Sequence, residues 1–156
     1  MKNITKNSFG TVLMGGILCV FMLSLLTACG NTQRATELGR NFNQSIYNAV
    51  AENGVIDFNN IADFEWEYLI IISPYSIVSR VLDSEGLNWR NPVTHIESSD
   101  VNVLLLFSYE NNVVAFSHFS RYNIDFVQVV TQYEKTVFNR NEAQFEFNNA
   151  VDNNEL

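Results

Sequence analysis

The sequence has few of the residues that cross-link or stiffen a chain: two cysteines, two prolines and seven glycines among 156 residues. Cys19 lies inside an apolar segment near the start of the chain, and Cys29 directly follows that segment. No cysteine follows Cys29, so the remaining chain has no disulfide, no thiolate nucleophile and no cysteine ligand for zinc. Its fold must depend on packing alone.

Histidine is equally scarce, and the motifs of common enzymes are missing. The two histidines, His95 and His118, lack the His-x-x-x-His spacing of a zinc site, which needs three or four ligands. We therefore predict no metal centre and no cofactor, and we interpret His118 as a hydrogen-bonded structural residue. The sequence contains no Gly-x-Ser-x-Gly motif and no glycine-rich phosphate loop, so we predict no catalytic residue.

Basic residues are outnumbered by acidic ones. Nine Lys and Arg oppose 17 Asp and Glu, which gives a formal net charge of −8 at pH 7. Residues 1–28 contain Lys2 and Lys6 and no acidic residue, so the charge without them is −10. Such a chain repels phosphate groups, and nucleic acid and anionic lipid head groups are therefore not expected as main partners.

What the start of the chain does contain is a secretory signal. Lys2 and Lys6 precede an apolar run from Val12 to Leu26, and Leu26-Thr27-Ala28-Cys29 has the form of a bacterial lipobox. The pattern predicts a signal peptide over residues 1–28 and diacylation of Cys29. Two acyl chains suffice for stable anchoring, because each buried methylene contributes about 0.8 kcal/mol. We expect a lipoprotein on the extracytoplasmic face of the cell membrane.

The alternative for this segment is an uncleaved membrane helix. The apolar run is short for a membrane span, which takes about 20 residues, and Gly15-Gly16 interrupts it. A retained helix would also not need a lipobox at its outer edge. We therefore favour lipidation.

The rest of the chain is expected to form one domain over residues 35–150, after a tether at 29–34 and before a frayed tail at 151–156. Its many aromatic and aliphatic residues argue against disorder. The expected fold is α+β: a mostly antiparallel sheet of about four to five strands, with an N-terminal helix, a short second helix and the helices on one face.

Apolar residues at steps of three and four predict the first helix over residues 35–52, with Asn53-Gly54 as its stop. A loop is expected from Val55 to Asp63. The short second helix should run from a Ser76 cap to Leu82, with Ile77 and Val81 facing inward and Gly86 beyond its end as the stop.

The clearest strand is FEWEYLIIIS, from Phe64 to Ser73, which alternates at first and is then apolar on both faces. A hairpin is expected from Val101 to Tyr109 and from Val113 to Phe119, joined by Glu110-Asn111-Asn112. On its second strand, alternation places Val114, Phe116 and His118 on one face.

The remaining segments are predicted less fully. His95-Ile96 is interpreted as a short strand, and residues 143–147 alternate like a final strand. Residues 124–137 fit either a helix or a strand.

One segment suggests a family. The run from Phe64 to Tyr75 (FEWEYLIIISPY) resembles a segment of small, uncharacterised lipoproteins of low-G+C Gram-positive bacteria, in which Phe-x-Trp-acid precedes an apolar strand that ends in Pro-Tyr. Trp89, the hairpin and an Arg121 followed by Asp125-Phe126 come in a similar order. The resemblance implies a lipid-anchored extracytoplasmic domain of unknown role, and it brings no catalytic residues.

Four residues are candidates for a ligand or partner surface: Trp66, Tyr75, Trp89 and Arg121. Flat rings bind sugars and peptides well, although an aromatic stripe at period two on a strand is more typical of a core. Tyr75 follows Pro74 at a strand exit, and its hydroxyl could reach Arg80 or Arg121, which we interpret as a structural hydrogen bond.

These features favour a non-catalytic binding or interaction module over an enzyme and leave the molecular activity open. Such a module would dock an envelope protein, a peptide or a wall component through a sheet edge or the face beside Tyr75. The alternative is a small cell-wall hydrolase whose acids, Glu65, Glu67, Glu97 or Asp100, must converge on one cleft. A third reading is a structural subunit of a membrane assembly, which would expose an apolar patch.

Overall fold

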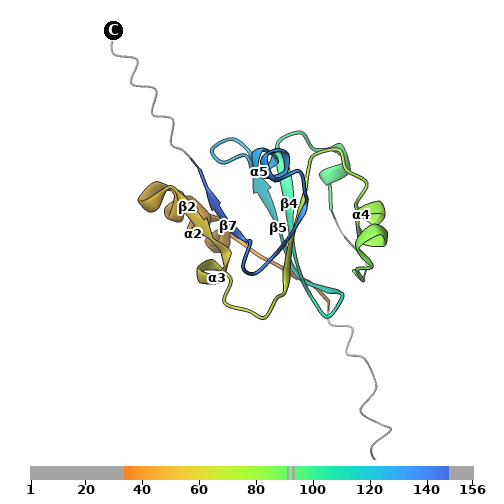
Figure 1. The fold of residues 1–156 in the computed structure, drawn as a ribbon. Helices are drawn as coiled ribbons and strands as arrows, with labels where there is room; N and C mark the ends of the chain where they lie inside the picture. Colours follow the sequence, from red (N-terminus) through yellow and green to blue (C-terminus); the bar gives the residue numbers. More distant parts are fainter. Residues whose placement is uncertain (1–33, 91, 93, 148–156) are drawn as a thin grey trace, which may run out of the picture. The chain divides into compact units, whose positions relative to one another are not determined.

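The structure is a computed structural model that describes residues 34–90, 92 and 94–147. The expected signal peptide over residues 1–28, the acylation site Cys29 and the tail 151–156 lie outside these residues. In the part of the chain that is described, no helix is long and apolar enough to cross a membrane. The described strands and helices form an α+β fold (Figure 1).

The main sheet has five strands in the order β1-β5-β4-β3-β6. Its middle is the predicted hairpin, β4 (Asn102–Tyr109) and β5 (Asn112–Ser120), and β4 pairs antiparallel with β3 (Tyr68–Ile72). Strand β6 (Val137–Asn139) pairs antiparallel with β3, whereas β1 (Thr36–Glu37) runs parallel to β5. The predicted fold class, a mostly antiparallel sheet of four to five strands, is confirmed.

The helices are short apart from the first. They are α2 (Arg40–Asn53), α3 (Phe58–Ile61), α4 (Val78–Glu85), α5 (Phe126–Tyr133) and the 3₁₀ helix η1 (Ile96–Ser98). Both α2 and α4 end at a glycine with positive φ, Gly54 at 68° and Gly86 at 65°. This left-handed conformation suits glycine because a Cβ atom strains it, so both predicted helix stops are confirmed.

The main sheet carries a core on each face, because β3 and β4 contain unbroken apolar runs, Leu69 to Ile72 and Val103 to Phe107, whose side chains alternate between the two faces. One core takes Leu69, Ile71, Leu105 and Phe107 from the sheet, and it packs against α2, α5 and a two-stranded sheet of β2 (Val55–Asp57) and β7 (Gln144–Glu146). The opposite core takes Ile70, Ile72, Leu104 and Leu106 and packs against α4 and η1. The expectation of helices on one face is therefore wrong, since α4 and α2 lie on opposite sides of the sheet (Figure 1).

Phe107 lies at the centre of the first core and is fully buried. Its ring contacts those of Phe42, Phe58, Phe64 and Trp66 at centroid distances of 5.7, 5.8, 5.3 and 5.4 Å. The interplanar angles of 60° to 90° are those of edge-to-face pairs, which are worth about 0.5–1.5 kcal/mol each beyond their buried area. Phe107 thus joins α2, α3 and the segment before β3 to the sheet.

The hairpin is tighter than predicted and contains a bulge. Glu110 and Asn111 form its turn with φ of 46° and 61°, whereas Asn112 already belongs to β5. The register shifts between Phe107 and Ser108, which leaves Val114 as an extra residue on β5. Val114 therefore packs against the first core, and its predicted place on one face with Phe116 and His118 is wrong.

Other predicted boundaries shift near the first helix. The stretch before Arg40 is not helical, because Thr36 and Glu37 pair with β5. The expected loop from Val55 to Asp63 contains β2 and α3, and Asp57 caps α3 by accepting a hydrogen bond from the Asn59 N–H.

Corrections also apply around α4 and β3. Strand β3 begins at Tyr68 and not at Phe64. Helix α4 is not capped by Ser76: the Val78 N–H donates to the Glu97 carboxylate at 3.3 Å, and Ile77 is 40% exposed and does not face inward. The expected strand at His95-Ile96 is occupied by η1. Residues 124–137, left open between helix and strand, contain α5 and the first residue of β6.

Replacement of Phe107 by alanine should lower the free energy of unfolding by about 3–5 kcal/mol, because it removes buried apolar surface and leaves a cavity. The urea midpoint, followed by circular dichroism, should fall at an unchanged m-value. Tyr122 is 82% exposed, so Tyr122→Ala serves as the control and should change stability by no more than about 0.5 kcal/mol. A loss below about 1 kcal/mol for Phe107→Ala would contradict its central position.

Candidate functional site

The four residues predicted to form a surface do not come together. Trp66 is 1% exposed and packs in the first core, with the Arg140 guanidinium 5.1 Å from its ring centroid. Trp89 is half-buried on the opposite face of the sheet, where its ring centroid lies 4.9 Å from that of Phe116. Both tryptophans therefore contribute to packing. For Trp66 this agrees with the interpretation that an aromatic stripe at period two on a strand belongs to a core.

Tyr75 and Arg121, the other two, lie at the end of the sheet where β3 ends and β4 begins. Tyr75 is 64% exposed and has a φ of 61°, a region that bulky residues rarely adopt. Its N–H donates to the Ile96 carbonyl at 2.9 Å, which holds the turn in place. Ile77, Val101 and Tyr122 are exposed as well. We call these residues (Tyr75, Ile77, Val101 and Tyr122) the tyrosine end.

Arg121 is engaged in a structural pairing. Its Nε and Nη2 atoms donate to the two carboxylate oxygens of Asp125 at 2.9 and 2.8 Å, and its Nη1 donates to the Asp100 carbonyl at 2.9 Å. Asp125 also caps α5 by accepting from the Val127 N–H. These hydrogen bonds lower the pKa of Asp125, and the hydrogen bonding from Arg121 has the largest effect. The guanidinium is therefore occupied by the fold itself.

The acids of the hydrolase alternative lie at two separate ends of β4. Glu67 sits beside the hairpin turn, where its carboxylate accepts from the Glu110 N–H at 3.2 Å, and Glu65 lies close to Tyr109. Glu97 and Asp100 instead precede the first residue of β4. An eight-residue strand spans roughly 20–25 Å, so these two pairs do not share a cleft.

His118 occupies a polar niche on β5. Its Nδ1 lies 3.7 Å from the Glu37 carboxylate, and a hydrogen bond of 3.2 Å links its Nε2 to the Thr94 hydroxyl. In the described residues, no three His, Cys, Asp or Glu side chains gather as metal ligands would.

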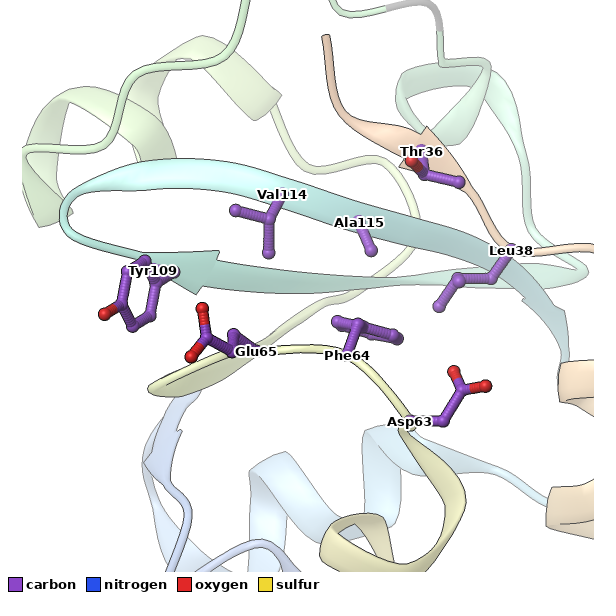
Figure 2. A pocket seen from close by; sticks show the side chains of 8 residues that line it. All are labelled: Thr36, Leu38, Asp63, Phe64, Glu65, Tyr109, Val114 and Ala115. Atoms are coloured by element: carbon purple, nitrogen blue, oxygen red, sulfur yellow. The ribbon is translucent and has the colours of Figure 1, made fainter. Parts of the chain in front are cut away.

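A groove of about 460 Å³ beside the hairpin combines apolar and polar side chains (Figure 2). It is formed by β1 and the residue after it, the segment before β3, the end of β4 and the bulge of β5. The lining residues are Thr36, Leu38, Asp63, Phe64, Glu65, Tyr109, Val114 and Ala115. We call it the Tyr109 groove.

The floor of the Tyr109 groove is apolar and its rim is acidic. Leu38, Phe64 and Val114 are partly buried against the first core and form the floor with Ala115. Glu65 and Tyr109 lie at one end of the groove and Asp63 toward the other (Figure 2). Among residues 34–90, 92 and 94–147, neither Asp63 nor Glu65 forms an ion pair. The groove thus offers uncompensated negative charge beside apolar surface.

The charge at the Glu65 end also affects Tyr109. Glu65, then Glu110, burial and Glu67 all raise the pKa of the Tyr109 phenol, because each disfavours the phenolate. Tyr109 therefore stays protonated at neutral pH, and its hydroxyl can both donate and accept a hydrogen bond.

The outer edge of β5, next to this groove, is largely covered. The Asn88 carbonyl accepts from the Val113 N–H at 2.9 Å, β1 pairs farther along, and the Asn43 side-chain amide donates to the His118 carbonyl at 3.1 Å. A partner strand would find little free backbone here, so the expectation of capture through a sheet edge gains no support at β5.

Sequence reasoning missed the Tyr109 groove, although one local signal was present. Asp63, Phe64 and Glu65 form an acid-aromatic-acid triplet next to a predicted strand, and Glu65 was considered as a catalytic acid and not as the rim of a groove. The other lining residues come from distant segments, and no local pattern joins them.

Comparisons with protein families, with curated proteins and with solved structures gave no match to this chain.

The variant Glu65→Gln should lower the pKa of Tyr109 towards its ordinary value, because the largest cause of the upward shift is removed. Tyrosine ring-carbon NMR across alkaline pH measures it. Glu52→Gln, on the exposed side of α2, is the control and should leave the Tyr109 titration unchanged. An unaltered pKa in Glu65→Gln would show that the carboxylate does not face Tyr109.

The variant Asp125→Asn should keep the helix cap and lose the ion pair, at a cost of about 1 kcal/mol at pH 7. The folded-state pKa of Asp125 is lowered, so the ionised carboxylate stabilises the fold. This stabilisation is fully present above the unfolded-state pKa and is lost as pH falls through the folded-state pKa. The stability difference from wild type, from urea unfolding, should be constant near neutrality and shrink below about pH 4. A difference independent of pH would contradict this assignment.

Proposed function

We propose that this chain is a lipid-anchored extracytoplasmic binding module without catalytic activity, and that it holds its partner in the Tyr109 groove. The lipobox at Cys29 supports the anchor, and the resemblance to small envelope lipoproteins agrees with it. The observation that carries the binding role is the groove itself: an apolar floor with an acidic rim that has no counter-ion among the described residues.

Ligand sites combine these two elements for a physical reason. Apolar surface supplies binding free energy that depends little on orientation, and a few polar groups then fix the orientation and select the ligand. In the Tyr109 groove, Leu38, Phe64 and Val114 supply the first element, and Asp63, Glu65 and Tyr109 supply the second. A volume of about 460 Å³ suits a side chain or a short segment of a partner.

The hydrolase alternative lacks this support. Hydrolysis of a glycoside takes two carboxyl groups roughly 5–10 Å apart across one scissile bond. Of these acids, only Glu65 lines the groove, whereas the Glu67 carboxylate accepts from the Glu110 N–H at the turn. Glu97 and Asp100 lie at the other end of β4. The Glu97 carboxylate, moreover, accepts from the backbone at the start of α4. We therefore favour binding over catalysis.

Replacement of Cys29 by alanine should abolish incorporation of labelled fatty acid and move the protein out of the membrane fraction, because the two acyl chains supply the anchor. Metabolic labelling and fractionation of intact cells measure both effects. Cys19→Ala is the matched control, since Cys19 lies inside the predicted signal peptide. Labelling that persists in Cys29→Ala would contradict lipidation at this residue.

The groove is tested by blocking it. Thr36 is exposed, lines the groove and lies in a strand, so Thr36→Trp should fill the groove without disturbing the core. Cross-linking on intact cells followed by purification should capture a partner with the wild type and lose it with Thr36→Trp. Thr131→Trp, on the exposed surface of α5, should retain the partner. Loss with Tyr122→Ser and retention with Thr36→Trp would instead place binding at the tyrosine end.

A further inference from the structure

We propose that the Tyr109 groove receives a lysine side chain of a partner protein, with its methylenes on the apolar floor and its ammonium at the Glu65 end. This inference rests on the proposed function and specifies the chemistry of the ligand.

The floor suits an unbranched aliphatic chain. Phe64, from the segment before β3, faces Val114 and Ala115 of the β5 bulge, and Ala115 contributes only a small side chain (Figure 2). Lysine commonly lays its four methylenes along apolar surface and keeps its charged head in water, which is the arrangement that this floor and rim would allow.

The Glu65 end suits a compact cation. The carboxylates of Glu65, Glu67 and Glu110 all act on Tyr109, so negative potential concentrates there. Of these residues, only Glu65 and Tyr109 line the groove, so the Glu65 carboxylate and the Tyr109 hydroxyl receive donors there. Glu67 is engaged as the acceptor of the Glu110 N–H. An ammonium group has three donors that can reach separate acceptors, whereas a guanidinium fits best on one carboxylate in a bidentate arrangement.

The partner is inferred to enter with a side chain and not with its backbone. The edge of β5 beside the groove already pairs with Asn88 and β1, and Asn43 covers the His118 carbonyl. Strand addition is therefore obstructed where the groove opens. The formal charge of −8 for the whole chain further favours a basic partner through long-range attraction.

The probe for the experiment is Nα-acetyl-lysine methylamide, whose one charge is the ammonium group. The acylated protein, which begins at Cys29, is placed in phosphatidylcholine nanodiscs, whose neutral lipid does not attract the cation. Methyl NMR should show shifts at Leu38, Val114 and Ala115, and none at Val78 and Leu82 in the opposite core. Binding should weaken as salt is added, because exposed charge pairs are screened.

Two sets of comparisons decide the role of the charge. The norleucine analogue, which keeps the methylenes and lacks the ammonium, should bind at least about fivefold more weakly, and Glu65→Gln should weaken lysine binding about twofold to fivefold. Asp63→Asn should have a smaller effect, since Asp63 lies toward the other end. Asp83→Asn, on the exposed side of α4, is the control and should have no effect.

Equal binding of the lysine and norleucine probes would overturn the inference, as would tighter binding of the arginine analogue. The absence of groove shifts with any probe would overturn it too. The proposed function fails separately, when Thr36→Trp retains the partner that the wild type captures. If Thr36→Trp loses the partner and the lysine probe causes no shifts, the proposed binding function is supported and its ligand is not a lysine side chain.

Discussion

The packing around Phe107 is the constraint on which the rest of the structure depends. Because no cysteine follows Cys29, no disulfide bond links the described strands and helices. Phe107 stands on the central strand β4 and meets rings from α2, α3 and the segment before β3. Segments far apart in the sequence are held in place by this one cluster, and each ring depends on its neighbours for close packing.

The Tyr109 groove is a consequence of the same packing. The Phe64 ring lies 5.3 Å from that of Phe107 and also lines the groove. Phe64 is half-buried, and its two neighbours, Asp63 and Glu65, are exposed at the rim. The bulge on β5 completes the floor by turning Val114 toward the first core. Core and groove therefore share residues, and the contact between Phe64 and Phe107 positions the Asp63 and Glu65 carboxylates at the rim.

The two ends of the sheet differ in character. The hairpin end combines a concave apolar surface with carboxylates, those of Asp63 and Glu65, that form no ion pair among the described residues. The tyrosine end presents exposed rings, and the guanidinium of Arg121 there is paired with Asp125. Tyr75 there keeps a left-handed backbone, a conformation that costs energy unless its surroundings hold it. The hydrogen bond from its N–H to Ile96 is one such restraint.

Local pattern alone determined the fold class, the hairpin, the helix stops at Gly54 and Gly86 and the doubly covered run from Leu69 to Ile72, because each depends on neighbours within a few residues. Only the tertiary structure decided the rest. A two-residue strand such as β1 has no periodicity to recognise, and a single bulged residue reverses every face assignment beyond it. The groove is lined by residues from four separate segments. Trp66, which the sequence suggested as part of a surface, is buried in the core beside Phe107. Which apolar residues meet is a property of the packed chain, since burial is set by neighbours that are distant in sequence.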